Sequence, residues 1–231
     1  MAIAFVQAPD PGASGSGTSL GLAFVSNVTA GNSIIVGCRT GGTTGTVTVA
    51  DNLGNTYVQD AEQDQTDDLH RAWIFSAHNV TGGACTVTVT VSVSSTLRMC
   101  IAEYSGLATS STLDKTATAQ HAASTTPSSG ATGTLLIPDE LVVGASTVAA
   151  DSTYTAGSGY TRRTSAPSNA GTARMAMEDK IVAATTGVTA DWTLGASTPW
   201  AALVATYKAA SAAAGQVPYQ PQYQSAPVMA Q

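Results

Sequence analysis

The three histidines are the side chains of this sequence best suited to proton transfer near neutral pH. They are His70, His78 and His121. The chain contains no Gly-x-Ser-x-Gly elbow, HExxH pair or CxxC pair that would join a histidine to a nucleophile or a metal. We therefore interpret the histidines as surface or loop-end residues, and the sequence predicts no catalytic residue and no enzymatic activity.

An acidic segment over residues 60–68 opens with the spacing of a calcium-binding loop, with carboxylates at its first, third and fifth positions. The pattern then fails, because Gln65 stands where the sharp turn needs glycine and Arg71 where the bidentate glutamate belongs. A solvated loop is the favoured interpretation, and a weakly bound hard cation is the alternative. The sequence predicts no metal site and no cofactor.

Glu178 and Asp179 could suggest the paired carboxylates of a glycosidase. Neighbouring residues on a strand point to opposite faces of the sheet, so these two side chains should diverge. We do not expect them to act as a pair.

Three cysteines, Cys38, Cys85 and Cys100, lie within expected strands. Cys38 and Cys85 share their strand faces with aliphatic residues, which favours buried free thiols acting as small hydrophobic groups. A disulfide between two of the three is the alternative, in a particle that leaves the reducing cell.

The elements that must position these residues are β-strands, because apolar and polar residues alternate along most of the chain. The segment 85–93 (CTVTVTVSV) is the clearest case. It predicts that Val87, Val89 and Val91 are buried while Thr86, Thr88 and Thr90 are less so. Hydrophobic residues make up 43% of the chain and charged residues 10%, which suits a packed core.

About twelve strands are expected, separated by turns rich in Gly, Asn and Asp, and no window of helical length keeps a 3.6-residue period. The sequence therefore predicts an all-β antiparallel sandwich, jelly-roll-like, with negligible helix. The expected strands cover residues 20–25, 33–39, 46–50, 56–59, 71–78, 85–93, 97–105, 132–137, 141–148, 174–182, 188–194 and 200–208.

The two halves of the chain repeat some of these patterns in the same order. Ile35-Val-Gly matches Val142-Val-Gly, an offset of 107 (142 − 35), and Arg71 matches Arg174 at an offset of 103 (174 − 71). We interpret this as a duplicated half-sandwich in which both halves supply strands to one core. Coincidence among Val-, Ala- and Thr-rich strands is the alternative.

The formal net charge of −6 and the absence of a Lys/Arg cluster argue against binding to nucleic acid. The N-terminus lacks the basic region and the long apolar run of a secretory signal, and no stretch has the length of a membrane span. We expect a protein made in a cytoplasm and not inserted in a membrane.

Composition changes after Lys208, which predicts a sandwich domain over residues 1–208 and an extended, low-complexity tail over 209–231. Such a tail has no core of its own, so we expect it to contact another subunit. The expected interface residues are Pro218, Tyr219, Pro221 and Tyr223.

Several phrases resemble a loose family of bacterial and phage β-sandwich proteins found on cell surfaces and virions. They are VTAGNSIIV (28–36), VADNLGNTY (49–57), AEYSG (102–106), and AGSGY (156–160) followed by ATYK (205–208). The resemblance spans residues 20–208 and implies a sandwich fold. Its motifs are turns and strand ends, so no catalytic residue can be carried over from it.

Two functions fit these expectations. The first is a non-enzymatic structural protein of a bacteriophage virion, such as a capsid decoration, collar or fibre subunit, located on the virion and released by lysis. It would assemble with itself as a homo-oligomer and with other virion proteins. The alternative is a carbohydrate-binding or adhesive module that contacts a surface glycan. Trp73, Trp192 and Trp200 could stack on sugars, but their place in strands favours a role in the core.

Overall fold

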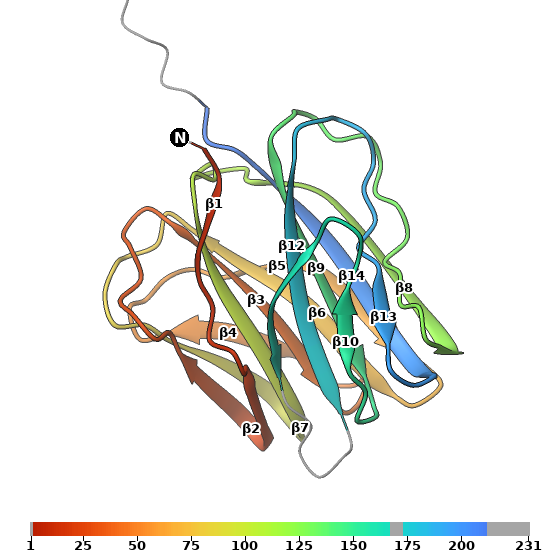
Figure 1. The fold of residues 1–231 in the computed structure, drawn as a ribbon. Coiled ribbons are helices and arrows are strands. Elements are labelled where there is room, and N and C mark those ends of the chain that lie inside the picture. The colour runs from red at the N-terminus through yellow and green to blue at the C-terminus, as the bar shows by residue number, and fades with distance from the viewer. Residues whose placement is uncertain (1, 167–172, 212–231) are drawn as a thin grey trace, which may run out of the picture.

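The computed structural model of the chain describes residues 2–166 and 173–211, and these residues form strands, turns and loops without a helix (Figure 1). Because the described part contains no helix, it also has none long and apolar enough to cross a membrane. The fourteen strands are β1 (Ala4–Gln7), β2 (Ala13–Ala23), β3 (Ser33–Thr40), β4 (Val47–Asp51), β5 (Val58–Gln65), β6 (His70–His78), β7 (Thr86–Ser105), β8 (Leu113–Ser124), β9 (Glu140–Val148), β10 (Tyr154–Ala156), β11 (Thr161–Ala166), β12 (Arg174–Val182), β13 (Trp192–Leu194) and β14 (Thr198–Lys208).

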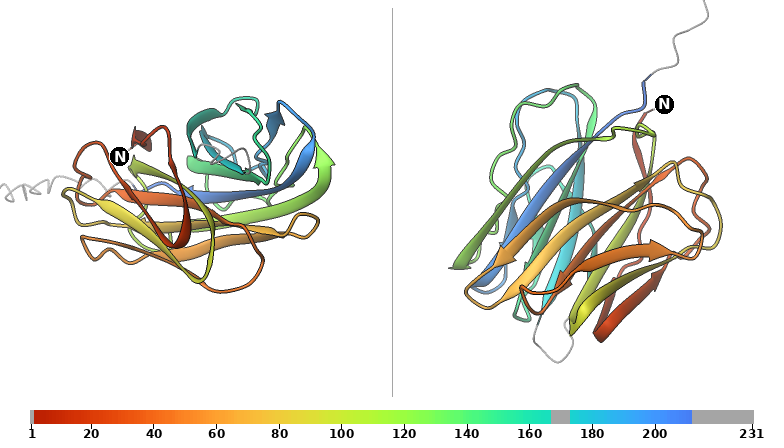
Figure 2. Two further views of the ribbon diagram at one scale, coloured as in Figure 1. Left: turned by 90° about the horizontal axis from the view of Figure 1, so that it is seen from below. Right: turned by 180° about the vertical axis from the view of Figure 1, so that it is seen from behind.

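The strands form an antiparallel sandwich of two main sheets, which confirms the predicted fold class. The first sheet has seven strands, with the central order β1-β7-β3-β6-β5 and with β2 and β4 also paired to β7. The second has the order β11-β12-β9-β14-β8, and β10 and β13 form a small separate sheet. Figure 2 shows the two main sheets stacked face to face. Their facing side chains, including Ile35, Ile74, Val143 and Leu203, form the central core.

The alternation predicted for the valine and threonine run is confirmed. Val87, Val89 and Val91 are at most 5% exposed, whereas the threonines between them are exposed or half-buried. These valines pack in one cluster with residues such as Val36 and Phe75 on the outer face of the same sheet. The first half of β7, with β2 and β4, therefore curls over that face and adds an outer layer.

The outer face of the second sheet is covered in a different way. Loops on either side of β9 and β12, together with the small sheet of β10 and β13, bury side chains such as Leu135, Val188 and Leu194 against Val142 and Trp200. Strands β3 and β9 are consequently buried on both faces along their whole length. A strand of this kind is expected to carry apolar residues at most positions, as these two do.

The repeat inferred from the sequence is present in the topology. The order β1-β7-β3-β6-β5 of the first half matches β8-β14-β9-β12-β11 of the second, element by element along the chain. The offset predicted for the Ile35 strand is wrong by one residue. Ile35 faces the central core, and so does Val143, at an offset of 108 (143 − 35), whereas Val142 faces outward. A slip of one residue moves every side chain to the other face.

Backbone geometry supports the corrected offset. The turn before β3 has Gly31 at φ 86°, and the turn before β9 has Asp139 at φ 61°, again 108 positions apart (139 − 31). The edge strands β5 and β11 each carry a β-bulge, between Gln59 and Ala61 and between Arg162 and Thr164, at an offset of 103 (162 − 59). Two special features in matching places make coincidence a poor explanation for the repeat.

Several predicted elements differ from the structure. Residues 132–137 form a loop instead of a strand. The backbone N–H groups of Thr132 and Leu135 donate to carbonyls of the loop that contains Val188. Residues 85–93 and 97–105 belong to one continuous strand, β7. Strands β1, β8, β10 and β11 and most of β2 were not predicted; β2, β8 and β11 are edge strands that carry Ala, Ser, Gly and charged residues where an apolar pattern was sought. The solvated loop expected from residue 60 is also wrong for residues 60–65, which belong to the edge strand β5.

The two residues after Lys208 also contact the sandwich. Ala209 forms a β-bridge with Leu107, and the backbone N–H of Ala210 donates to the carbonyl of Gly106 at 2.8 Å. Contacts with the sandwich therefore continue to Ala210, two residues past Lys208.

Candidate functional site

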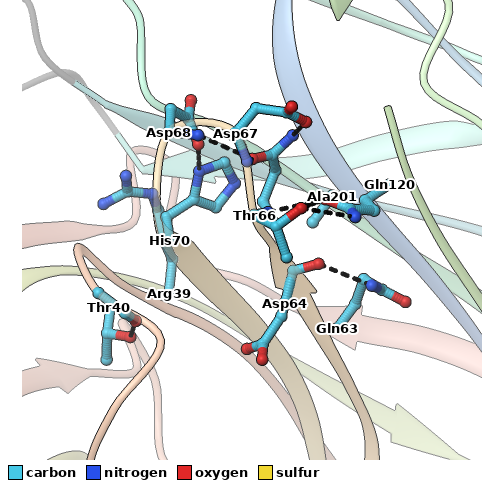
Figure 3. A network of polar contacts seen from close by, with 12 residues as sticks. Arg39, Thr40, Gln63, Asp64, Thr66, Asp67, Asp68, His70, Gln120 and Ala201 are labelled. Atoms are coloured by element: carbon cyan, nitrogen blue, oxygen red, sulfur yellow. Dashed lines mark hydrogen bonds and ion pairs between the residues drawn. The ribbon is translucent and has the colours of Figure 1, made fainter. Parts of the chain in front are cut away.

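A polar network with several buried side chains surrounds the β5–β6 turn (Figure 3). His70 Nδ1 lies 2.6 Å from Asp68 Oδ1, and the His70 side chain has no exposed surface. Arg39 and Arg98 are also buried nearby, at 3% and 1% exposure. Burial, with the neighbouring Arg98 adding to it, lowers the pKa of Arg39 to about 10.

The turn of this network connects the two sheets. The Gln65 side chain donates to the carbonyl of His121 at 3.0 Å, and the Thr66 N–H donates to Gln120 Oε1 at 2.8 Å. His121 and Gln120 belong to β8 of the second sheet, whereas Gln65 ends β5 of the first. The network thus holds one end of the sandwich closed.

The Asp68–His70 pair has the form of a base held by an orienting carboxylate, but its chemistry is restricted by burial. A general base must reach the proton it removes, and the imidazole of His70 is sealed from solvent. Burial lowers the pKa of His70 in spite of Asp68, which favours a neutral ring. His70 follows the β5–β6 turn, so it is a loop-end residue, one of the two places expected for it, but it is not on the surface. We assign it to the structural network.

The other two histidines lie at different places. His78 is half-buried and bonds through Nδ1 to Ser33 Oγ at 2.8 Å. His121 is exposed and stacks on Trp200, with ring centroids 5.8 Å apart. His70 and His78 stand at opposite ends of β6, and His121 stands on β8. Because the three rings are separated in this way and have different partners, the structure does not bring them together into one site.

The carboxylates of the acidic segment have protein partners. Asp64 pairs with Arg71, which also lies 3.0 Å from Glu62. Within residues 2–166 and 173–211, no group of three or more His, Cys, Asp and Glu side chains is arranged to hold a metal ion.

Glu178 and Asp179 point to opposite faces of β12, as predicted. Asp179 faces the central core and pairs with Arg163, whereas Glu178 lies under the β10–β13 sheet and accepts a hydrogen bond from the Gly157 N–H at 2.9 Å. Its other oxygen, Oε1, is buried without a partner. Burial, reinforced by the negative charge of Asp191, raises the pKa of Glu178 to about 8.

An open pocket of about 440 Å³ lies above Glu178, between the β10–β13 sheet and the loop before β9. Its walls are mostly small and polar, with one carboxylate from Asp191. Trp192 belongs to the wall but is only 2% exposed, so its ring face is packed inside. Trp73 and Trp200, at 2% and 5%, are buried as well, which confirms the predicted core role of the tryptophans.

The outer layer presents an exposed face of small, uncharged side chains. Thr90 stands opposite both Ser19 and Thr48, and Thr88 stands opposite both Gly21 and Ala50. The three strands therefore align their short residues in register. The face consists of Ser19, Gly21 and Ala23 of β2, Thr86, Thr88 and Thr90 of β7, and Thr48 and Ala50 of β4. We call it the threonine face.

Cys38, Cys85 and Cys100 are all buried and free in the structure. Burial raises the pKa of Cys100 to about 12, so the thiol stays protonated and poorly reactive.

The predicted interface residues Pro218, Tyr219, Pro221 and Tyr223 lie outside the described residues. The structure therefore does not test that prediction.

The fold and these sites define the class of the protein as an all-β, two-sheet sandwich built from an internal repeat. Comparison of the chain with protein-family models, with curated proteins and with solved structures found no match.

Proposed function

We propose that this protein is a non-enzymatic structural component of a bacteriophage virion that acts by assembling with itself and with other virion proteins. The observation that carries the proposal is the threonine face. The resemblance of the turn motifs to those of virion and surface sandwiches supports the same class of function.

The threonine face suits contact with another protein for two physical reasons. Its side chains are short and carry no charge, so a partner can approach closely without desolvating an ion. Threonine and serine also lose little side-chain entropy when they are covered, compared with lysine or glutamate. Behind the face, Val87, Val89 and Val91 are packed in the core, which keeps the surface rigid.

The test places a charge at the centre of the face. We expect Thr88→Arg to reduce oligomers of the purified chain, or its incorporation into particles, without lowering the melting temperature. Thr155→Arg is the matched control, because Thr155 is an exposed strand threonine on β10, outside the face. Sedimentation velocity over a concentration series measures self-assembly, and analysis of purified particles measures incorporation. A wild-type chain that neither associates nor enters particles would contradict the proposal.

The C-terminal segment offers a separate test of assembly. Because Ala209 and Ala210 bond to the sandwich, truncation should follow Ser211 and not Lys208. We expect the truncated chain to melt normally and to assemble less well than the full chain. Normal assembly by the truncated chain would remove residues 212–231 from the proposal and leave the threonine face to account for assembly.

A second candidate is binding of a surface carbohydrate at the open pocket beside β10 and β13. The specific observation is the pocket wall, which contains the hydroxyl residues Thr126, Ser128, Ser158 and Thr193 together with Asp191. Such groups pair well with sugar hydroxyls. A glycan array compared between the wild type and Asp191→Ala distinguishes this function, since assembly does not require the pocket.

A further inference from the structure

The internal repeat places two related polar sites at the edge of the central core. Residues of the two halves that stand at an offset of 103 are equivalent. The equivalent pairs are Asp60 and Arg163 at the bulges of β5 and β11, Ser76 and Asp179 on β6 and β12, and Tyr104 and Tyr207 on β7 and β14. Phe5 and Leu113 are also equivalent, because they stand opposite Tyr104 and Tyr207 respectively. Each tyrosine reaches the bulge of the other half of the chain.

The site built on Arg163 is complete within the chain. Arg163 Nε lies 3.0 and 2.9 Å from the two carboxylate oxygens of Asp179, and its guanidinium carbon lies 4.1 Å from the centroid of the Phe5 ring. Asp179 also hydrogen-bonds to the buried Tyr104 phenol, which contributes with burial to raising the pKa of that phenol. A tyrosine, a carboxylate and a guanidinium thus form one closed group.

The site built on Asp60 has the tyrosine and the carboxylate but lacks the cation. The Tyr207 hydroxyl donates to Asp60 Oδ2 at 2.7 Å, and Ser76 bonds to the same carboxylate. Among the described residues, no Lys, Arg or His forms an ion pair with Asp60, whose pKa is raised by burial. His78 supplies no charge near pH 7, because burial lowers its pKa to about 4.

A pocket lies beside Asp60, and its lining includes Ser76 and Leu113, the residues equivalent to the Asp179 and Phe5 that contact Arg163. It has a volume of about 220 Å³, roughly seven times the share of one water molecule in the liquid. This is room for a guanidinium and several methylene groups. The exposed Val58 and the half-buried Leu113 offer apolar surface to an aliphatic stem, and Ser111 and Thr112 complete the rim.

We propose that this pocket, the Asp60 pocket, binds an alkylguanidinium group, the group that ends an arginine side chain. Asp60 provides the counter-charge, and its hydrogen bonds with Tyr207 and Ser76 hold the carboxylate in place beside the pocket. The planar guanidinium matches a carboxylate better than an ammonium does, because its N–H donors are fixed in a fork. The inference does not depend on the proposed virion function.

The test uses the full chain and two small probes, ethylguanidinium and ethylammonium, followed by amide shifts in NMR titrations. We expect saturable shifts at residues 58–60, 76–78 and 111–113 with ethylguanidinium, and binding several-fold weaker with ethylammonium. Asp60→Asn should weaken ethylguanidinium binding at least about tenfold, since a hydrogen bond to a charged group is lost. Asp191→Asn, a change at an exposed carboxylate in another pocket, is the matched control.

A second variant copies the closed site into the first half. In the double variant Asp60→Arg/Ser76→Asp, the introduced arginine should fill the pocket from within, so ethylguanidinium should no longer bind while the protein still melts cooperatively. Equal binding by the wild type and Asp60→Asn, equal binding of the two probes, or shifts confined to other surface carboxylates would overturn the proposal.

The same samples show whether the guanidinium group comes from a second copy of the chain or from a free small molecule. If the guanidinium belongs to a second copy of the chain, ethylguanidinium should dissociate oligomers of the wild type, and Asp60→Asn should itself associate less than the wild type. If it belongs to a free small molecule, the oligomeric state should not respond while the pocket shifts persist. Absence of both responses in the wild type contradicts the proposal.

Discussion

Asp60 and Arg163 occupy the same position in the two halves of the sandwich, each as the extra residue of a β-bulge on an edge strand. Their charges are opposite. Asp60 accepts a hydrogen bond from Tyr207, whereas Arg163 pairs with Asp179, the hydrogen-bond partner of Tyr104. Both halves therefore have the same bulge, but the carboxylate stands at the bulge in the first half (Asp60) and on β12 in the second (Asp179). One site became a closed ion pair, and the other an open pocket.

The closed site should contribute to stability. Asp179 is only 4% exposed, so removing its guanidinium partner leaves a buried carboxylate without a counter-ion. We expect Arg163→Met to lower the free energy of unfolding by about 1–3 kcal/mol, with the methionine keeping part of the contact with Phe5. Urea unfolding followed by tryptophan fluorescence measures the change.

The neighbouring arginine is the control for this measurement. Arg162 lies on the same strand, but its side chain and that of its partner Asp10 are 37% and 44% exposed, with the charged atoms 3.6 Å apart. Arg162→Met should change the free energy of unfolding by less than about 0.5 kcal/mol. A similar loss for both variants would mean that the Arg163–Asp179 pair has no special role in stability.

The sequence was sufficient to predict the fold class because most strands alternate clearly. The Val and Thr run of β7 is an example, and its register is the one predicted. The repeat offset could not be fixed in the same way, because β3 and β9 are apolar on both faces and look alike after a slip of one residue. Only the facing core residues, such as Ile35 and Val143, define the true match.

The candidate sites were harder to predict from the sequence than the fold. Nothing in the residue order shows that Tyr207 meets Asp60, 147 positions away, since that contact depends on how the two sheets stack. A local signal did exist for the bulges. Asp60 and Arg163 are charged residues followed by Ala61 and Thr164, both of which turn inward and are buried, and a search for repeats at an offset of 103 would have aligned them.

The register of β7 gives a second prediction. Val89 is 2% exposed in the cluster under the outer layer, so Val89→Thr places a hydroxyl where no polar partner is available. We expect a loss of roughly 1–3 kcal/mol in the free energy of unfolding. Thr88→Val, at the adjacent outward position, should change it by less than about 0.5 kcal/mol. Denaturant midpoints of the two variants decide the question, and the opposite order would refute the register.

The buried carboxyl of Glu178 should make stability depend on pH. Its pKa is raised to about 8 in the folded chain, against about 4.3 in an unfolded one. Between these values the folded state keeps a proton that the unfolded state has released. The stability from neutral Glu178 is therefore complete below about pH 4 and is lost as the pH rises through about 8, by at most about 1.4 kcal/mol per pH unit.

Glu178→Gln isolates this contribution, because glutamine keeps an oxygen to accept the Gly157 N–H and cannot ionise. The free energy of unfolding of this variant, relative to the wild type, should increase steadily from pH 5 to pH 8.5. Thr88→Val adds no titrating group, so its difference from the wild type should stay flat over the same range. A flat difference for Glu178→Gln as well would show that Glu178 is ionised in the folded protein at neutral pH.

The cysteines provide the last prediction, in which burial controls reactivity. All three thiols are free and buried, and burial raises the pKa of Cys85 and Cys100 to about 12. A thiol reacts through its thiolate, so both low ionisation and lack of access should protect these residues. In the native protein, without reductant, an aromatic disulfide reagent should therefore find almost no fast-reacting thiol. In denaturant it should titrate all three. If denaturation releases only one thiol, the other two form a disulfide, and the arrangement of free cysteines is wrong.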